Sequence, residues 1–417
     1  MPVDRAILKS LEKSVFEEKN QLSAEKTTII EEFSAGATKI NRYINEFWTS
    51  RQRQASAIHE ISYRACFKPQ LPRFFINLFT NKGDTVYDPF AGRGTTAIET
   101  GLMDRKVIAN DVNPLSQILS EPRLALPPVR AIEKRLSEIP FDNKPENEID
   151  LSMFYHFRTE AELLSLRKYL TSQKEESMDN IDKWIRMVAT NRLTGHSTGF
   201  FSVYTMPPNQ AVSAKRQKII NSRRNQQPTY RDVRSIILRK TVQLTRNLSP
   251  DQVMRLRKAS LSAQFLISDA SDTKTIPAES VDLTVTSPPF LDVVQYSGDN
   301  WLRCWFNNIN LEAIEKRLTM AKTLDEWTSK MSAVFNELYR ITRPGGWIAF
   351  EVGEVKRGRL KLEEEIIPIG IDNGFECAGI VINRQNFTKT SNIWGIKNNC
   401  SGTNSNRIVL FNKKLQG

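Results

Sequence analysis

The chain has 417 residues, of which 40% are hydrophobic and 25% charged, and this ordinary composition excludes a disordered or fibrous protein. Its 59 Lys and Arg residues outnumber its 47 Asp and Glu residues, so the formal net charge is +12. Three histidines and four widely separated cysteines leave little material for a metal site, a disulfide framework or Ser-His-Asp catalysis, and a cytoplasmic location is expected. No apolar run is long enough to predict a membrane span or a signal peptide.

Differences in composition divide the chain into three parts. Residues 1–60 are mostly polar and rich in helix formers, and they predict an N-terminal helical arm. Residues 61–119 and 261–417 contain short apolar runs separated by glycine and proline, which predict an α/β domain with a doubly wound, Rossmann-like sheet. Between these two stretches, residues 120–260 show helical spacing and predict a mainly helical insert.

The α/β domain is expected to begin with a strand–helix–strand unit. Apolar runs predict strands at 85–87 and 106–109, with a helix at 95–102 between them. Such a unit opens a doubly wound sheet. Further strands of the same sheet are predicted at 264–267, 281–286, 347–352, 377–383 and 407–411.

A glycine loop with the sequence DPFAGRGTT, residues 88–96, joins the first strand to the helix. Gly92 and Gly94 allow a ligand to approach the backbone closely, and the start of the helix offers unpaired N–H groups, although an ordinary turn can also contain two glycines. The lysine of a phosphate-binding P-loop is absent, which argues against a nucleoside triphosphate. Asp111 follows the next strand, where an acid can hold a ribose diol. The pattern predicts a nucleoside cofactor and leaves both NAD and S-adenosylmethionine open.

Nearly all of the net charge of the chain is contributed by one segment of the predicted insert. Residues 215–258 contain thirteen basic residues and two acidic ones. A charge run is often only a solvated helix face, but side chains that can contact bases lie among these cations. Because a phosphate backbone supplies the matching negative field, nucleic acid is the predicted partner.

The strand predicted at 281–286 leads into a second motif, TSPPF at residues 286–290. Its two prolines fix the backbone and donate no hydrogen bonds, which leaves neighbouring carbonyl groups free to accept them. At the carboxyl end of a strand beside a cofactor, this loop can present acceptors to an amino group. The alternative is a proline-rich connection without a chemical role.

The two motifs, with Asp111, together resemble the amino-methylating DNA methyltransferases. In that family the glycine loop binds S-adenosyl-L-methionine and the polar-Pro-Pro-aromatic loop is catalytic. A serine before the prolines is similar to the cytosine-N4 branch, although in many cytosine-N4 enzymes the catalytic loop precedes the cofactor loop. Further segments that resemble the family are FKPQLP at 67–72, SDA at 268–270, NFTKT at 386–390 and GTNSNR at 402–407.

The resemblance implies a catalytic site at Ser287, Pro288, Pro289 and Phe290. The Ser287 hydroxyl and the Pro288 carbonyl would accept hydrogen bonds from an exocyclic amino group. Phe290 would stack on a base that is flipped out of the duplex. Positioning and local electrostatics would supply most of the rate, with no cysteine nucleophile.

The resemblance also implies roles for three carboxylates in cofactor binding. Asp111 would bind the ribose hydroxyls, Asp269 would lie near the adenine amino group, and Asp88 would contact the cofactor's amino group or cap the turn. The predicted cofactor-binding residues are Phe67, Lys68, Pro69, Asp88, Phe90, Ala91, Gly92, Gly94, Thr95, Thr96, Asp111, Val112, Asp269, Ala270 and Thr286. The predicted DNA-binding residues are Lys215, Arg216, Arg223, Arg224, Tyr230, Arg231 and Arg234.

The resulting prediction is a site-specific methyltransferase that acts on N4 of a flipped cytosine in double-stranded DNA. It would be the modification enzyme of a restriction–modification system, with a cognate restriction endonuclease as a further partner and without a metal or a membrane. Adenine-N6 methylation would use the same fold and loop, and related loops also act on RNA. An inactive DNA-binding module would show a broken motif, whereas both motifs are intact. A dehydrogenase would leave the SPPF loop without a role.

Overall fold

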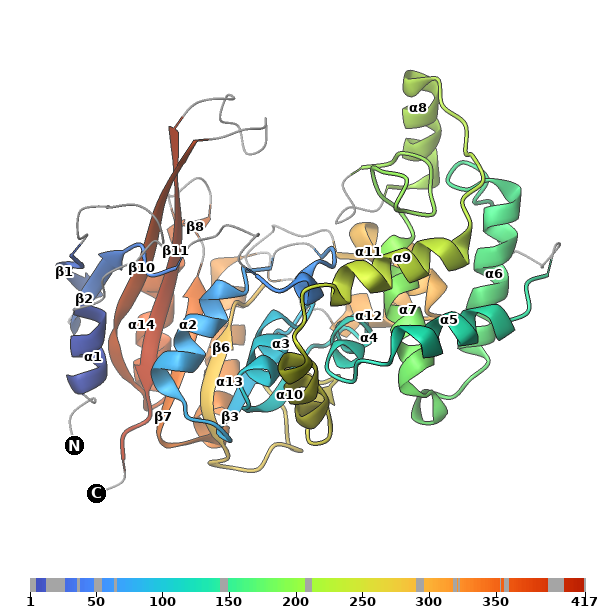
Figure 1. The fold of residues 1–417 in the computed structure, drawn as a ribbon. Coiled ribbons are helices and arrows are strands. Elements are labelled where there is room, and N and C mark those ends of the chain that lie inside the picture. The colour runs from blue at the N-terminus through green and yellow to red at the C-terminus, as the bar shows by residue number, and fades with distance from the viewer. Residues whose placement is uncertain are drawn as a thin grey trace.

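The structure of the chain is a computed structural model. The structure describes residues 5–12, 27–35, 38–48, 55–63, 66–142, 149–206, 212–289, 296–317, 321, 323–352, 354–355, 360–388 and 401–415. Within these ranges, the centre of the protein is a nine-stranded sheet with helices on both faces (Figure 1).

The strands of this sheet confirm the predicted fold class. They are β1 (Ile29–Ala35), β2 (Thr38–Asn45), β3 (Thr85–Asp88), β4 (Lys106–Asn110), β5 (Gln264–Leu266), β6 (Val281–Thr286), β7 (Thr342–Val352), β10 (Glu376–Thr388) and β11 (Ser401–Asn412). Their order is β1-β2-β10-β11-β7-β6-β3-β4-β5. From β3 the chain runs outward to β4 and β5 and then returns to β6 on the other side of β3, with all these neighbours parallel. The β3–β6 boundary is therefore the switch point of a doubly wound sheet, where such folds bind ligands.

The alternation of side chains along the strands builds a core on each face. Val86 of β3 packs with α2 (Gln70–Phe79), whereas the next residue, Tyr87, packs with α13 (Leu324–Ile341) and α14 (Leu362–Asp372). Because successive side chains of a strand point to opposite faces, a sheet covered on both sides needs apolar residues in succession. The predicted apolar strands meet this requirement.

The expectation of a helical arm at residues 1–60 is wrong for most of the described part. The only α-helix there is α1 (Arg5–Glu12), while β1 and β2 form an antiparallel hairpin. β2 adds to the sheet in parallel with β10, and its Tyr43 and Ile44 are buried on opposite faces. The polar composition is misleading because β1 is an edge strand, where charged side chains such as Glu31 and Glu32 stay exposed.

The insert is mainly helical, as predicted, but it shares its core with the sheet domain. One apolar cluster joins Ile98 and Val107 of the sheet domain to Trp184, Ile237 and Leu256 of the insert. The helices of the insert are α5 (Val129–Glu138), α6 (Phe157–Thr171), α7 (Asn180–Arg192), α8 (Ala214–Arg224), α9 (Val233–Thr245) and α10 (Pro250–Ser260). Of these, α8 projects from the rest of the insert (Figure 1). The remaining short elements are α3 (Thr95–Leu102), α4 (Leu115–Ser120), α11 (Tyr296–Phe306), α12 (Leu311–Arg317), β8 (Glu354–Val355) and β9 (Leu360–Lys361).

The described helices include none that is both long and apolar enough to cross a bilayer. Cys66, Cys304 and Cys377 are free thiols, and Cys400 lies outside the described residues. Among the side chains that the structure describes, no three His, Cys, Asp or Glu residues are arranged to hold a metal ion.

Candidate active site at the switch point of the sheet

The two sequence motifs meet at the carboxyl ends of β3 and β6. These strands are parallel neighbours, with Tyr87 opposite Thr284. Asp88 ends β3 and Thr286 ends β6, and the Thr286 hydroxyl donates a hydrogen bond of 2.6 Å to Asp88 Oδ1. The glycine loop and the TSPPF loop are therefore joined directly, although 198 residues separate the two bonded side chains.

Asp88 is buried and has one carboxylate oxygen left for a ligand. Its Oδ1 accepts hydrogen bonds from Thr286 and from the backbone N–H of Phe90, and the Thr96 side chain also interacts with the carboxyl group, whereas Oδ2 lacks a hydrogen-bond partner of normal geometry among the described residues. Burial raises the pKa of Asp88 to about 6. Because an unpaired buried carboxylate oxygen is costly, this site favours a ligand that carries a positive charge or a hydrogen-bond donor.

The glycine loop has a backbone that other residues would strain. Gly92 and Gly94 have φ angles of +52° and +71°. A Cβ atom on Gly94 would lie 2.2 Å from the Ser120 hydroxyl oxygen, and one on Gly92 would lie 3.4 Å from the Tyr63 ring. The loop delivers the backbone to the start of α3, where the predicted site residues Thr95 and Thr96 are buried. Thr96 also donates a hydrogen bond of 3.2 Å to the Val285 carbonyl beside the TSPPF loop.

Asp111 lies beside the glycine loop, where its ribose-binding role was predicted. Its Oδ2 accepts a hydrogen bond of 2.9 Å from Gly92 N–H, and its Oδ1 accepts one of 3.0 Å from Asn113 N–H. Burial raises the pKa of Asp111 to about 6. Each carboxylate oxygen retains a lone pair, so these contacts leave room for hydroxyl donors.

Asn110 organises this edge of the sheet, a role that the sequence did not reveal. Its amide nitrogen donates to the carbonyl groups of Pro89 (3.2 Å) and Ser268 (3.0 Å), and its Oδ1 accepts from Ser268 N–H (3.0 Å). These bonds tie together the carboxyl ends of β3, β4 and β5. The available signal is a single polar side chain at the end of an otherwise apolar strand.

Asp269 and Ala270 lie beyond the end of β5, in the turn that the resemblance places beside adenine. Asp269 pairs with Lys330 Nζ at 2.6 Å and accepts two hydrogen bonds from Ser271. Although burial opposes the effect, the Lys330 and Ser271 bonds hold the pKa of Asp269 below its usual range. Ala270 is buried in the core. The adenine contact stays a prediction.

The upstream segment packs over the glycine loop through Arg93. This side chain donates to the carbonyl groups of Ile61 (3.0 Å) and Phe67 (3.5 Å). Phe67 is half-buried and Lys68 is exposed. The predicted residues nearby are placed as follows: Pro69 precedes α2 and is buried, Phe90 and Val112 are half-buried, and Ala91 is buried.

The TSPPF loop is anchored by a tryptophan that the sequence did not single out. Ser287 is half-buried, Pro288 is buried and Pro289 is exposed, and the Pro289 carbonyl accepts a hydrogen bond of 3.1 Å from the indole N–H of Trp327. Trp327 is buried on α13. Phe290, the predicted base-stacking residue, lies outside the described residues.

Glu351 is a second residue missed from the sequence. It is buried on β7, where its Oε1 accepts a hydrogen bond of 2.6 Å from Asn406 of β11 and its carboxyl group is also hydrogen-bonded to the Ser287 side chain. Burial raises the pKa of Glu351 to about 7, against the effect of these two bonds. A lone acid in the apolar run WIAFEV was the available signal.

The predicted DNA-binding residues form two groups. The four on α8 are exposed, and the Arg224 guanidinium also lies 3.8 Å from the centre of the Tyr204 ring. The other three make contacts within the insert: the Tyr230 hydroxyl bonds Glu162, Arg231 donates to backbone carbonyls of the 197–202 loop, and Arg234 donates to a carbonyl after α5. The exposed group on the projecting helix is the better placed to meet a large polyanion.

Parts of the chain are similar in sequence to known proteins. Residues 9–117 match the sequence model of a family described as DNA methylase. Over 91 residues the chain is 30% identical to the type II methyltransferase M.MjaII of Methanocaldococcus jannaschii, an overlap of 22% of this chain and 17% of that protein. Over 131 residues it is 25% identical to the type II methyltransferase M.MvaI of Kocuria varians, covering 31% and 27%. Among solved structures, TrmN from Thermus thermophilus aligns with a TM-score of 0.32 at 12% identity, over 87% of this chain and 53% of that one.

The matched segments thus span less than a third of these two curated relatives. The family match includes the glycine loop, and its region ends before the TSPPF loop. The residues present fit the predicted cofactor, S-adenosyl-L-methionine: Asp88 Oδ2 is unpaired, and the glycine loop leaves no space at Gly94 for a side chain. The match bears out this cofactor, and over residues 9–117 the chain is similar to the amino-methylating DNA methyltransferases.

Proposed function

We propose that the protein is a site-specific DNA methyltransferase that transfers a methyl group from S-adenosyl-L-methionine to N4 of cytosine. The observation that carries this proposal is the Thr286–Asp88 hydrogen bond, which joins the TSPPF loop to the glycine loop. The serine of the SPP sequence supports cytosine N4 as the target, and the family match supports DNA as the substrate.

The cofactor supplies the electrophilic methyl group, while the chain positions the amino group that attacks it. An exocyclic amine is a weak nucleophile because its lone pair is conjugated with the ring. Hydrogen bonds to the Ser287 hydroxyl oxygen and the Pro288 carbonyl would turn this lone pair toward the methyl group. The nitrogen would form the new bond to carbon as the carbon–sulfur bond of the methyl donor breaks and the sulfur leaves as a neutral thioether, and the nitrogen would then release a proton to water. Catalysis would depend mainly on positioning.

Glu351 supports the orientation that Ser287 needs for this role. An ionised Glu351 carboxylate can only accept hydrogen bonds, so the Ser287 hydroxyl must donate its hydrogen to it. The lone pairs of the Ser287 oxygen then face the substrate amino group. Glu351 thus acts as a positioning residue, and the Trp327 bond to the next part of the loop limits movement of the prolines.

The substrate base would have to leave the duplex to reach this site, because its amino group is otherwise paired. The exposed cations of α8 would hold the DNA backbone while the base is extruded. The type II methyltransferase relatives support a place in a restriction–modification system, with an endonuclease that cuts the unmodified sequence.

The test is transfer of a labelled methyl group from the cofactor to duplex DNA of varied sequence. We expect label in DNA with the wild-type protein, a loss of at least about a hundredfold in rate for Ser287→Ala, and no change for Ser137→Ala, an exposed serine on α5. Cofactor affinity should be the same in all three proteins. Label in RNA but not in DNA, or full activity of Ser287→Ala, would refute the proposal.

A further inference from the structure

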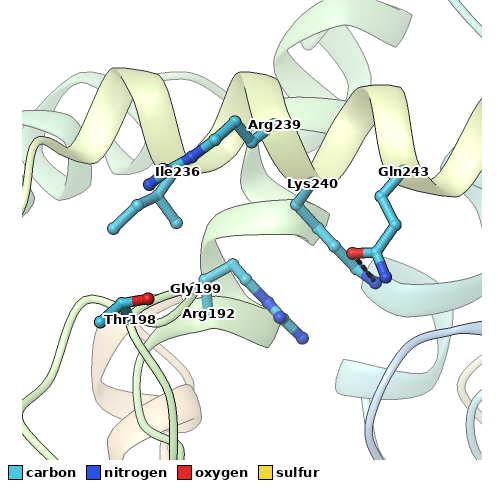
Figure 2. Close-up of a pocket in the computed structure, with 7 residues that line it drawn as sticks. All are labelled: Arg192, Thr198, Gly199, Ile236, Arg239, Lys240 and Gln243. Carbon is cyan, nitrogen blue, oxygen red and sulfur yellow. Dashed lines mark hydrogen bonds between the residues drawn. The ribbon is translucent and has the colours of Figure 1, made fainter.

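A cationic pocket lies in the insert, beside the 197–202 loop to which Arg231 donates. Its volume is about 220 Å³, and it lies between α7 and α9. Arg192 comes from the end of α7, Arg239, Lys240 and Gln243 come from α9, and residues 198–199 close one side. Figure 2 shows Lys240 and Gln243 descending from α9 on the side where the Arg192 guanidinium lies.

Two of these three cations are almost completely buried. The exposed fraction is 6% for Lys240 and 7% for Arg192, whereas Arg239 is exposed. In the part of the chain that the structure describes, neither buried cation forms an ion pair with a carboxylate. Lys240 Nζ donates to Gln243 Oε1 at 3.1 Å, and Arg192 donates to the backbone and side-chain oxygens of Asn191 at 3.1 and 2.7 Å.

Glu60 attracts the Lys240 charge but forms no ion pair with it among the described residues. Glu60 is bonded instead by Gln243 (2.8 Å) and by Arg246 (2.9 Å). Burial lowers the pKa of Lys240 to about 7, and nearby Arg192 adds to the effect despite the opposing attraction of Glu60. Burial lowers the pKa of Arg192 to about 10, with a contribution from Arg303. Two desolvated cations without a counter-ion are costly, so the pocket is suited to an anion.

The dimensions and chemistry of the pocket narrow the class of anion. The volume is below the range of about 300–1,000 Å³ typical of sites for drug-sized ligands, so the pocket suits a small group. Lys and Arg donors together match the oxygens of a phosphate, which accept short charge-assisted hydrogen bonds. The source of that phosphate is either a nucleic-acid backbone or a free phosphate compound.

We propose that this pocket binds one backbone phosphate of the substrate DNA, an inference that rests on the proposed function. The helix α9 lies between the projecting α8 and the sheet domain (Figure 1), so a duplex in contact with both would pass over it. Arg239, exposed at the pocket, would meet the approaching phosphate first. The buried pair Lys240 and Arg192 would then fix the phosphate and set the position of the duplex.

The first experiment measures DNA affinity as a function of salt concentration. Lys240→Met keeps the apolar stem and removes the charge, and Lys82→Met, an exposed lysine between α2 and β3 that lies outside the basic segment, is the matched control. We expect Lys240→Met to weaken DNA binding about tenfold. The slope of log K against log salt should become less negative by about one. Because the substitution removes an uncompensated buried charge, Lys240→Met without DNA should unfold at the same or a higher temperature than the wild type.

A second experiment identifies the source of the phosphate. Single methylphosphonate substitutions, which remove one backbone charge, are scanned along the duplex. We expect one position to weaken wild-type binding and to have no further effect on Lys240→Met. Inorganic phosphate serves as the free-anion probe, with the unfolding temperature as its readout.

Equal DNA affinity and equal salt slopes for the Lys240→Met and Lys82→Met proteins would overturn the inference. So would unchanged DNA binding together with Lys240-dependent stabilisation by inorganic phosphate, because the source would then be a free phosphate compound. In either case methyl transfer by the wild-type protein would leave the proposed function intact. Conversely, Lys240-dependent DNA binding without methyl transfer would refute only the proposed function.

Discussion

Replacing Glu351 by glutamine should stabilise the protein above neutral pH. Burial raises the pKa of Glu351 from 4.5 to about 7, so between these values the folded protein binds more protons than the unfolded chain. The free energy of unfolding must therefore fall as the pH rises through this range. The favourable contribution of the protonated Glu351 carboxyl group is fully lost above about pH 7. Since each pKa unit corresponds to about 1.4 kcal/mol, the ionised carboxylate reduces the free energy of unfolding by roughly 3 kcal/mol at pH 8. Glutamine keeps the shape of the side chain without the charge.

Urea unfolding of Glu351→Gln and wild type at pH 5 and pH 8 tests this reasoning. The control is Glu133→Gln, which changes an exposed glutamate on α5. We expect the difference in unfolding free energy between Glu351→Gln and wild type to grow by roughly 2.5 kcal/mol from pH 5 to pH 8, and the control to follow the wild type. Identical pH dependence of Glu351→Gln and wild type would show that Glu351 does not carry a raised pKa. Under the proposed function, the same variant should also transfer methyl groups more slowly.

Three further substitutions test the site. Trp327→Phe removes the indole hydrogen bond to the TSPPF loop and should slow methyl transfer without changing cofactor affinity. The control, Trp184→Phe, loses an indole hydrogen bond of 3.0 Å inside the insert and should change stability alone. Equal rates of methyl transfer for the two variants would show that the Trp327 bond does not hold the loop in place. Gly94→Ala places a Cβ atom 2.2 Å from the Ser120 hydroxyl oxygen at a φ of +71°, so unfolding free energy should fall by at least about 1–2 kcal/mol and calorimetry should detect no cofactor binding. Asp88→Asn should weaken cofactor binding about tenfold in the same assay, and unchanged affinity would remove Asp88 from the cofactor site.

The motifs could be predicted because each is a local pattern. The strand ending in Asp88, the turn at Gly92 and Gly94 and the helix after it all lie within 85–102. An apolar strand followed by two prolines is equally local. Their meeting follows from the order of strands at the switch point, which the fold class implies.

The partners of Ser287 could not be predicted in this way. Glu351 lies on β7 and Asn406 on β11, and they contact each other only because β7 and β11 are antiparallel neighbours. The place of the N-terminal strands in the sheet could not be predicted for the same reason, because it depends on contacts between distant residues. For example, the backbone N–H of Phe47 donates to Asn383 Oδ1 across 336 residues. Composition marks such a segment as polar, whereas its pairing partner lies in a distant part of the chain.

The basic insert illustrates a further distinction. The charge of residues 215–258 is visible in the sequence, but charge alone does not separate exposed cations from buried ones. The buried pair of the pocket joins Lys240 to Arg192, which lies outside the charged segment on another helix. Packing of α7 against α9 creates that pair.

Identifying the base that receives the methyl group is the direct test of methyl transfer to N4 of cytosine. Duplex DNA is incubated with the protein and S-adenosyl-L-methionine, then digested to nucleosides that are identified by mass spectrometry. We expect N4-methylcytosine, formed by the wild type and absent with Ser287→Ala. N6-methyladenine in its place would contradict cytosine as the target, and no methylated nucleoside with cofactor still bound would contradict DNA as the substrate.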